Sequence, residues 1–219
     1  APVIDQGDTT AMTLDEDGSQ TLSLSATDSD GDALTWSDTS SASNGGVNVD
    51  SNGLVTYVPV ADFYGNDTFT VQVSDSELTD SITVSVTVNS VNDAPIIAEG
   101  ASVTLEVNKD SSDSVTFTAS DADGDPLTWS ISSGAVEGIV TQTGSEFSYA
   151  PAADFNGSDS FVVQVSDGTA TGISTVNVTV IAVNDAPVVT SSPVTTANEY
   201  QVYAYDVAAS DAEDDAVSY

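Results

Sequence analysis

Polar and apolar residues alternate along several stretches of the chain, and three of them lie in its first half. They are Thr21–Ala26, Thr68–Val73 and Ile82–Val88. A period of two is typical of strands that are buried on one face. The pair Asn52-Gly53 predicts a two-residue hairpin loop, and Thr143-Gly144 takes its place further along the chain. No stretch of useful length has a helical period, so the pattern predicts an all-β protein.

The strand pattern is repeated. The loop Asp28–Asp32 reads Asp-x-Asp-Gly-Asp, which returns at Asp121–Asp125 and, with substitutions, at Asp211–Asp215. The segment Ser90–Pro95 returns at 182–187, and each copy separates two runs of strands. Such a fixed period indicates a tandem array. We predict domains at 1–93 and 94–185 and the incomplete start of a third at 186–219.

Each complete repeat contains about seven short strands, which predicts an antiparallel Greek-key β-sandwich of the immunoglobulin or cadherin type. Aromatic positions recur in register, which favours a core role over a ligand platform. The residues expected to point inward, with their equivalents in the second repeat, are Leu22, Leu24, Trp36, Val55, Tyr57, Phe69, Val71, Val84 and Val86.

The third repeat holds only two strands and the start of another. A sheet of two or three strands is only marginally stable in water. We expect the natural chain to continue beyond residue 219; the alternative is that a second copy completes the sheet by strand addition.

The large negative charge of the chain limits the kinds of partner that it can bind. The chain has 35 acidic residues, one basic residue and no histidine, for a net charge of −34. Such a chain repels nucleic acid and anionic membranes and attracts cations. It has no cysteine and no apolar run near the roughly 18 residues of a membrane helix. A generally acidic surface explains part of the charge, since Asp5, Asp38, Asp50 and Asp80 do not recur, but many other acids recur at fixed positions.

The recurring motifs resemble a known family. Asn92-Asp93-Ala94-Pro95, the Asp-x-Asp-Gly-Asp loop and Val73-Ser74-Asp75 are similar to the cadherin-like tandem repeats of large bacterial surface and secreted adhesins, and more distantly to cadherins. The resemblance covers two whole repeats and the start of a third. It implies calcium bound between consecutive domains, a role in adhesion or biofilm formation, and an extracellular location.

Physical chemistry supports a cation site independently. In a sandwich of this connectivity, the recurring acids gather at the ends of the domains. Calcium takes six to eight oxygen ligands, which these residues supply. Two carboxylates about 5 Å apart repel by roughly 3 kcal/mol at an effective dielectric constant near 20, and a divalent ion reverses this term. A single acidic loop is more simply a solvated turn, and the loop at Asp28 does not fit an EF-hand, because its glycine comes too early.

The expected calcium ligands fall into three sets. Those at the first joint are Glu16, Asp17, Asp62, Asp67, Asn92, Asp93, Asp121, Asp123, Asp125 and Asp167. Those at the second joint are Asp154, Asp159, Asn184, Asp185, Asp211 and Glu213. A third, weaker set at the start of the chain contains Asp28, Asp30, Asp32 and Asp75.

The two joints differ at one position. Lys109, the only cation in the sequence, aligns with Glu16. We hypothesise that its ammonium group substitutes for part of the metal charge at the second joint, so that this joint binds fewer or weaker ions. The alternative is an ordinary exposed lysine.

Catalysis is not expected. Nucleophilic mechanisms need a base beside the nucleophile, and the chain has neither histidine nor cysteine. We predict a non-enzymatic, calcium-rigidified spacer whose partners are neighbouring repeats, and further copies of itself or surface glycans. One alternative is a carbohydrate-binding module, for which Tyr64 is the candidate aromatic because the second repeat has Asn156 there. Another is a subunit of a self-assembling extracellular filament.

Overall fold

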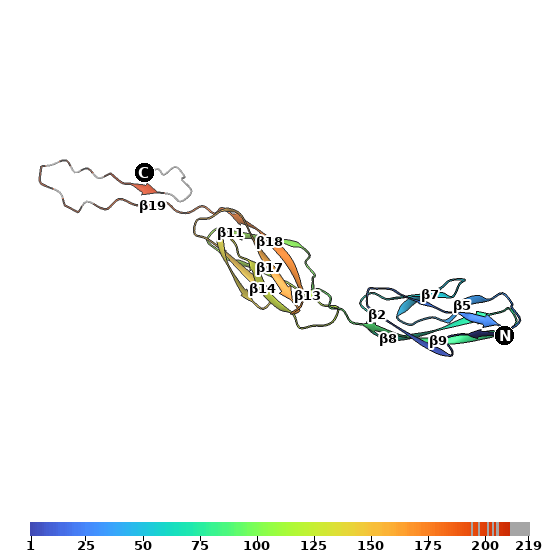
Figure 1. Ribbon diagram of the computed structural model, residues 1–219. Coiled ribbons are helices and arrows are strands. Elements are labelled where there is room, and N and C mark those ends of the chain that lie inside the picture. The colour runs from blue at the N-terminus through green and yellow to red at the C-terminus, as the bar shows by residue number, and fades with distance from the viewer. Residues whose placement is uncertain (194, 197, 201, 203, 205, 211–219) are drawn as a thin grey trace. The chain divides into compact units, whose positions relative to one another are not determined.

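The computed structural model describes residues 1–193, 195–196, 198–200, 202, 204 and 206–210 (Figure 1). All regular structure in these residues is β-strand, as the sequence predicts. None of these residues forms a helix with the length and apolar character needed to cross a membrane. Contacts divide the chain into two units. Unit 1 consists of residues 1–94 with 121–125, and unit 2 of residues 95–120 with 126–219.

Unit 1 is a β-sandwich. One sheet has the strand order β2-β9-β8-β5 and the other β3-β7-β6, while β1 pairs with β4. The strands are β1 (Pro2–Ile4), β2 (Thr9–Asp15), β3 (Gln20–Ser23), β4 (Ala26–Asp28), β5 (Thr35–Ser40), β6 (Gly45–Val49), β7 (Leu54–Pro59), β8 (Gly65–Ser74) and β9 (Thr79–Asn89).

Unit 2 repeats this arrangement with sheets β11-β18-β17-β14 and β12-β16-β15 and the pair β10-β13. Its strands are β10 (Ile96–Ile97), β11 (Ser102–Asn108), β12 (Asp113–Thr116), β13 (Ala119–Ser120), β14 (Thr128–Ser133), β15 (Gly138–Thr143), β16 (Glu146–Pro151), β17 (Gly157–Ser166) and β18 (Thr171–Ile181). A final pair, β19 (Val188–Val189) with β20 (Ala209–Ser210), has the same antiparallel form as β10 with β13.

One strand pair in each sandwich is parallel rather than antiparallel. The first strand of the repeat is broken by a turn at Gly7, whose φ is 79°. Before the turn, β1 pairs antiparallel with β4; after it, β2 pairs parallel with β9 over the whole of its length. Because the chain changes sheets at the turn, it meets the last strand running in the same direction. Gly100 occupies the equivalent turn in unit 2, where β11 pairs parallel with β18.

The core confirms most of the inward positions predicted from the alternation. Val55, Tyr57 and Val84 are fully buried, while Leu22 and Trp36 are half-buried and pack against the core. The Tyr57 ring stacks on Phe69 at a centroid distance of 6.0 Å, and Tyr149 stacks on Phe161 at 6.3 Å. Tyr57 and Tyr149 are therefore core residues and not ligand platforms.

The two hairpins differ in loop length. Asp50 N–H donates to Leu54 O and Gly53 N–H donates to Asp50 O, so the loop at Asn52-Gly53 holds three residues, not the expected two. A type I turn followed by a glycine with positive φ gives this geometry. In unit 2, Thr143 pairs directly with Glu146, which leaves the two-residue loop Gly144-Ser145, one position later than the predicted pair Thr143-Gly144.

The buried tyrosines require a neighbour without a side chain. A Cβ atom added at Gly45 would lie 2.5 Å from the Tyr57 ring, whereas one added at Gly46 would meet nothing within 4 Å. We expect Gly45→Ala to lower the free energy of unfolding of unit 1 by about 2 kcal/mol through overpacking. Gly46→Ala should change it by less than about 0.5 kcal/mol. Thermal denaturation of both variants tests this, and equal effects would contradict it.

Candidate metal centre

Seven carboxylates gather at one end of unit 1. Glu16 and Asp17 follow β2, Asp62 precedes β8, and Asp93 follows β9. The loop 121–125, which belongs to unit 1 by its contacts, adds Asp121, Asp123 and Asp125. Within each of three overlapping sets, carboxylate oxygens lie within 4.8 Å of one another: Glu16 with Asp93 and Asp123, Asp17 with Asp62 and Asp93, and Asp121 with Asp123 and Asp125. We call these seven residues the first acidic group.

Local backbone geometry fixes two of these side chains. Asp17 and Asp62 have φ values of 58° and 59°, in the left-handed region that Asp tolerates better than most residues. The Asp62 N–H donates to Asp17 Oδ1 at 3.3 Å, which joins the turn after β2 to the turn before β8. The two carboxylates are thus held side by side by their turns.

Glu16 is the most buried member, with 5% of its surface exposed. Its N–H donates to Asn89 O at 3.0 Å, which continues the parallel pairing of β2 with β9. Its Oε1 accepts a 2.6 Å hydrogen bond from Val91 N–H. The side chain is therefore anchored beside the segment that carries Asp93.

The loop 121–125 is organised by one oxygen of Asp121. Asp121 Oδ1 accepts hydrogen bonds from the N–H groups of Asp123 at 3.1 Å and Asp125 at 3.2 Å. Asp123 in turn accepts from Asp93 N–H at 2.9 Å and from Ser90 Oγ at 3.2 Å. The loop is therefore bonded to the segment that carries Asp93.

Two oxygens of the first acidic group are buried without a hydrogen-bond donor: Asp93 Oδ2 and Asp121 Oδ2. Burial raises the pKa of Asp93, and the negative charges of Asp62, Asp17, Asp123 and Glu16 raise it further. A buried carboxylate oxygen without a donor is costly unless a cation compensates it. The arrangement fits a hard cation, since every side-chain ligand is an oxygen.

A second acidic group lies in unit 2. Asp110, Asp154 and Asp185 place oxygens within 4.8 Å of one another. Lys109 Nζ donates to Asp185 Oδ2 at 2.7 Å, and this hydrogen bond raises the pKa of Lys109 above its ordinary value against the opposing effect of burial. Lys109 is 4% exposed, so the alternative of an ordinary surface lysine is wrong.

A third group forms at the other copy of the acidic loop, where Asp28, Asp30 and Asp32 lie within 4.8 Å of one another. The amino group of Ala1 lies 3.1 Å from Asp28 Oδ2 and 3.5 Å from Asp75 Oδ2, so two carboxylates converge on one cationic nitrogen. The ion pair with Ala1 lowers the pKa of Asp28, and hydrogen bonds from Leu78 and Glu77 N–H lower that of Asp75.

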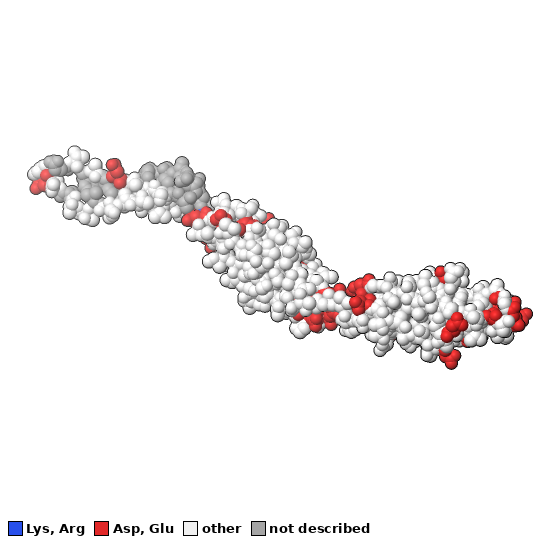
Figure 2. All heavy atoms as spheres, viewed as in Figure 1, with Lys and Arg blue, Asp and Glu red and all other residues white. Residues whose placement is uncertain are grey.

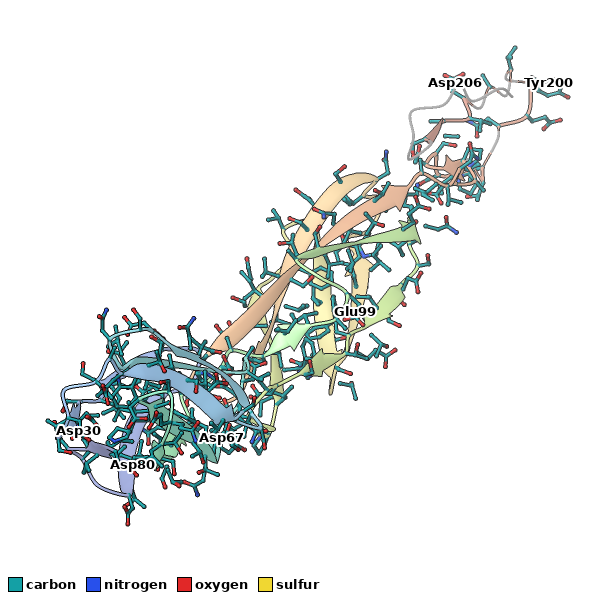
Figure 3. The ribbon with its side chains drawn as sticks, turned by 90° about the vertical axis from the view of Figure 1, so that its right-hand side faces the viewer. Asp30, Asp67, Asp80, Glu99, Tyr200 and Asp206 are labelled. Atoms are coloured by element: carbon teal, nitrogen blue, oxygen red, sulfur yellow. The ribbon has the colours of Figure 1, made fainter. Side chains whose placement is uncertain are left out.

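Asp67 and Asp159 are not members of these groups. Asp67 accepts hydrogen bonds from the N–H groups of Ser43 and Asn44 and from the hydroxyl of Tyr57. Burial alone would raise its pKa, but these donors outweigh burial and lower it. Asp159 has the equivalent bonds to Val136, Glu137 and Tyr149. We therefore leave both out of the proposed ligand set: their carboxylates already bind a loop to a core tyrosine. In Figure 3, Asp30 and Asp67 lie toward opposite sides of the first sandwich.

The other predicted ligands that the structure describes form hydrogen bonds with the backbone. Asp167 Oδ1 accepts from the N–H groups of Thr169 and Ala170 in the turn before β18. The side-chain amides of Asn92 and Asn184 each donate to the carbonyl of the aspartate that follows. Asp211 and Glu213 lie outside the described residues.

One member of the acidic groups, Asp110, is absent from the expected ligands. It aligns with Asp17, which is an expected ligand of the first joint. Alignment of the two repeats was therefore the signal that could have found Asp110.

The surface view agrees with this distribution. In Figure 2, most acidic atoms of the first sandwich lie toward its ends, and much of its middle is white. The face drawn shows no basic atoms, in keeping with the burial of Lys109.

The sequence profile of the bacterial Ig domain matches residues 1–87 and again residues 92–180. The chain belongs to the bacterial Ig domain family. The two Ig domains are also similar in fold to cadherin domains. The extracellular domain of protocadherin gamma B4 is 17% identical, with a TM-score of 0.51, over 96% of this chain and 38% of that one. Human protocadherin-24 EC1-2 is 18% identical, with a TM-score of 0.49, over 83% of this chain and 99% of that one.

A further structural match is the endo-fucoidan hydrolase MfFcnA4, from glycoside hydrolase family 107. It is 24% identical, with a TM-score of 0.40, over 83% of this chain and 29% of that one. The Ig domains thus span less than a third of that enzyme, and similarity at this level carries no functional argument. None of the curated proteins compared with the chain matches it.

The separation of Asp67 from the first acidic group gives a test. We expect Asp67→Asn to lower the free energy of unfolding by about 2 kcal/mol, because buried N–H groups lose an acceptor. The loss should be the same in calcium and in chelator. Because the pKa of Asp67 is lowered, its contribution is present above about pH 4 and disappears as the pH falls through the lowered pKa.

The matched control for this variant is Asp62→Asn, which removes an exposed member of the first acidic group. It should not lower stability in chelator, because it only relieves repulsion, and it should weaken calcium binding in calorimetry. A calcium-dependent stability loss in Asp67→Asn would return Asp67 to the ligand set.

Proposed function

We propose that this pair of bacterial Ig domains binds calcium at the first acidic group and serves as a non-catalytic spacer or adhesion module of an extracellular bacterial protein, such as an adhesin active in biofilms. The observation that carries the proposal is the pair of buried carboxylate oxygens without donors, Asp93 Oδ2 and Asp121 Oδ2. Both belong to the first acidic group, whose seven carboxylates form three overlapping sets.

The choice of calcium follows from the ligands. The group contains oxygen donors alone, which suits hard divalent cations and not zinc or copper. Calcium accepts six to eight oxygens in flexible geometry, whereas magnesium demands a near-octahedral site and retains water. The group has seven carboxylates on two turns, one segment and one loop, which suits the flexible geometry of calcium better than the octahedral geometry of magnesium.

Calcium would act as a cross-link between separate stretches of chain. The proposed ligands come from the turn after β2, the turn before β8, the segment after β9 and the loop 121–125. Calcium at ten to a hundred times its dissociation constant adds about 1.4–2.7 kcal/mol per site. Extracellular modules bind it with dissociation constants of about 10⁻⁴–10⁻³ M.

The raised pKa of Asp93 gives a direct test. A carboxylate whose pKa is raised on folding opposes folding as the pH rises through that raised value. We expect Asp93→Asn to raise the melting temperature in chelator at pH 7, because the repulsion disappears. The same variant should lose most of the stabilisation that calcium gives the native chain. Differential scanning calorimetry with calcium and with EDTA measures both effects.

The control for Asp93→Asn is Asp38→Asn, which removes the same charge from an exposed position on β5. It should melt like the native chain under both conditions. If Asp93→Asn melts lower than the native chain in EDTA, or keeps the full calcium effect, the assignment of Asp93 as the central ligand is wrong.

The spacer role is tested separately from binding. We expect small-angle X-ray scattering of the full chain to give a larger maximum dimension in calcium than in EDTA, because bound ions would restrain loop 121–125 against the rest of unit 1. Unchanged scattering together with calorimetric binding would reject the spacer role and leave the metal site in place.

A carbohydrate-binding role is the second candidate, and one observation favours it. Tyr64 is 50% exposed in the loop before β8, a position where the second repeat has Asn156. Exposed aromatic rings can pack against sugar rings. Glycan-array binding that is lost in Tyr64→Ala would support this role, and the spacer proposal expects no binding.

A further inference from the structure

Lys109 occupies the same structural position as Glu16. Each residue follows the strand that pairs in parallel with the last strand of its repeat. The Glu16 N–H donates to Asn89 O at 3.0 Å, and the Lys109 N–H donates to Ile181 O at 2.9 Å. The two residues are 5% and 4% exposed. The backbone therefore places a carboxylate in one repeat and an ammonium group in the other at equivalent buried sites.

The carboxylates around this position are also equivalent. Asp110 has a φ of 61° and Asp154 a φ of 63°, and Asp154 N–H donates to Asp110 Oδ1 at 3.2 Å. Asp17 and Asp62 have the same conformations and the same hydrogen bond. Asp185 takes the place of Asp93 in the repeated segment. The two units therefore carry equivalent sets of four residues, and the sets differ only in having Glu16 in unit 1 and Lys109 in unit 2.

This substitution changes the local charge. Glu16, Asp17, Asp62 and Asp93 are four carboxylates, with a formal charge of −4. The equivalent set in unit 2 has the carboxylates of Asp110, Asp154 and Asp185 and the ammonium group of Lys109, with a formal charge of −2. The ammonium group contacts Asp185 Oδ2 at 2.7 Å, and the Lys109 side chain is 1% exposed. Asp93, the counterpart of Asp185, has a buried oxygen without any donor.

We propose that the ammonium group of Lys109 is a permanent internal replacement for one calcium ion in unit 2. It neutralises Asp185 from inside the protein and closes this position to a divalent ion, because two cations cannot share it. The proposal rests on the proposed calcium function of unit 1. It predicts that the two repeats respond differently to chelation: the end of unit 1 loosens, while the turn after β11 keeps its structure.

Exchange of the two residues tests the replacement. Calcium binding to the full chain is measured by equilibrium dialysis and calorimetry. We expect Lys109→Glu to bind about one further ion and Glu16→Lys to bind about one fewer. The double exchange should restore the native count. The control for Glu16→Lys is Glu146→Lys, which makes the same charge change at an exposed position on β16. This variant should bind as many ions as the native chain.

The outcomes separate the two proposals. A native chain that binds no calcium rejects the proposed function. A native chain that binds calcium, together with a folded Lys109→Glu variant that gains no ion, overturns the replacement and leaves the function of unit 1 intact. Circular dichroism establishes folding. If Lys109→Glu fails to fold, trypsin cleavage after the native Lys109 tests the replacement instead.

Trypsin provides that second measurement, because Lys109 is the only lysine or arginine in the sequence. Cleavage after Lys109 requires its side chain to leave Asp185. We expect the native chain to be cut at the same slow rate in calcium and in EDTA. Asp185→Asn should be cut on the order of tenfold faster, since the charge pair that holds the side chain is lost. Asp113→Asn is the control, at an exposed aspartate on β12. Much faster cleavage of the native chain in EDTA would overturn the proposal.

Discussion

Repulsion between carboxylates that the backbone forces together is the interaction on which the rest of this structure depends. The valine-rich cores and the parallel pairing of the first and last strands leave little freedom at the ends of the sandwiches. The turns there hold carboxylate oxygens within 4.8 Å of one another. Packing of the core therefore brings these carboxylates together against their electrostatic repulsion. Each cluster needs positive charge or hydrogen-bond donors to offset this repulsion.

The carboxylates of the described residues lie in three kinds of environment. Asp67 and Asp159 receive backbone N–H groups and a tyrosine hydroxyl, which make them fixed parts of the fold. Asp185 receives the ammonium group of Lys109. Asp93 and Asp121 each keep a buried oxygen without a donor. The same residue type thus supports a loop, an ion pair or a proposed metal site, according to which donors its neighbours supply.

Sequence reasoning recovered the fold and most of the acidic groups, because both depend on repetition. The alternation of Val84 and Val86 with polar residues, and the repeat of Asp28–Asp32 at Asp121–Asp125, can be recognised without coordinates. The hydrogen bonds of Asp67 could not be predicted in this way. Its role depends on Ser43 and Asn44, more than twenty residues away, whose N–H groups carry no mark in the sequence. The parallel pairing of β2 with β9 was also missed, because it results from the change of sheet at Gly7.

That parallel pairing has a mechanical consequence. In unit 1, β2 follows the short first strand β1, and β9 is the last strand. The strands β2 and β9 run in the same direction and are paired from Thr9 with Thr83 to Asp15 with Asn89. Tension applied at the two ends of the domain would slide these strands past each other along their length. All the hydrogen bonds between them would then resist together, instead of separating one at a time as in a hairpin pulled from its open end. The arrangement suits a protein that must bear load along its chain.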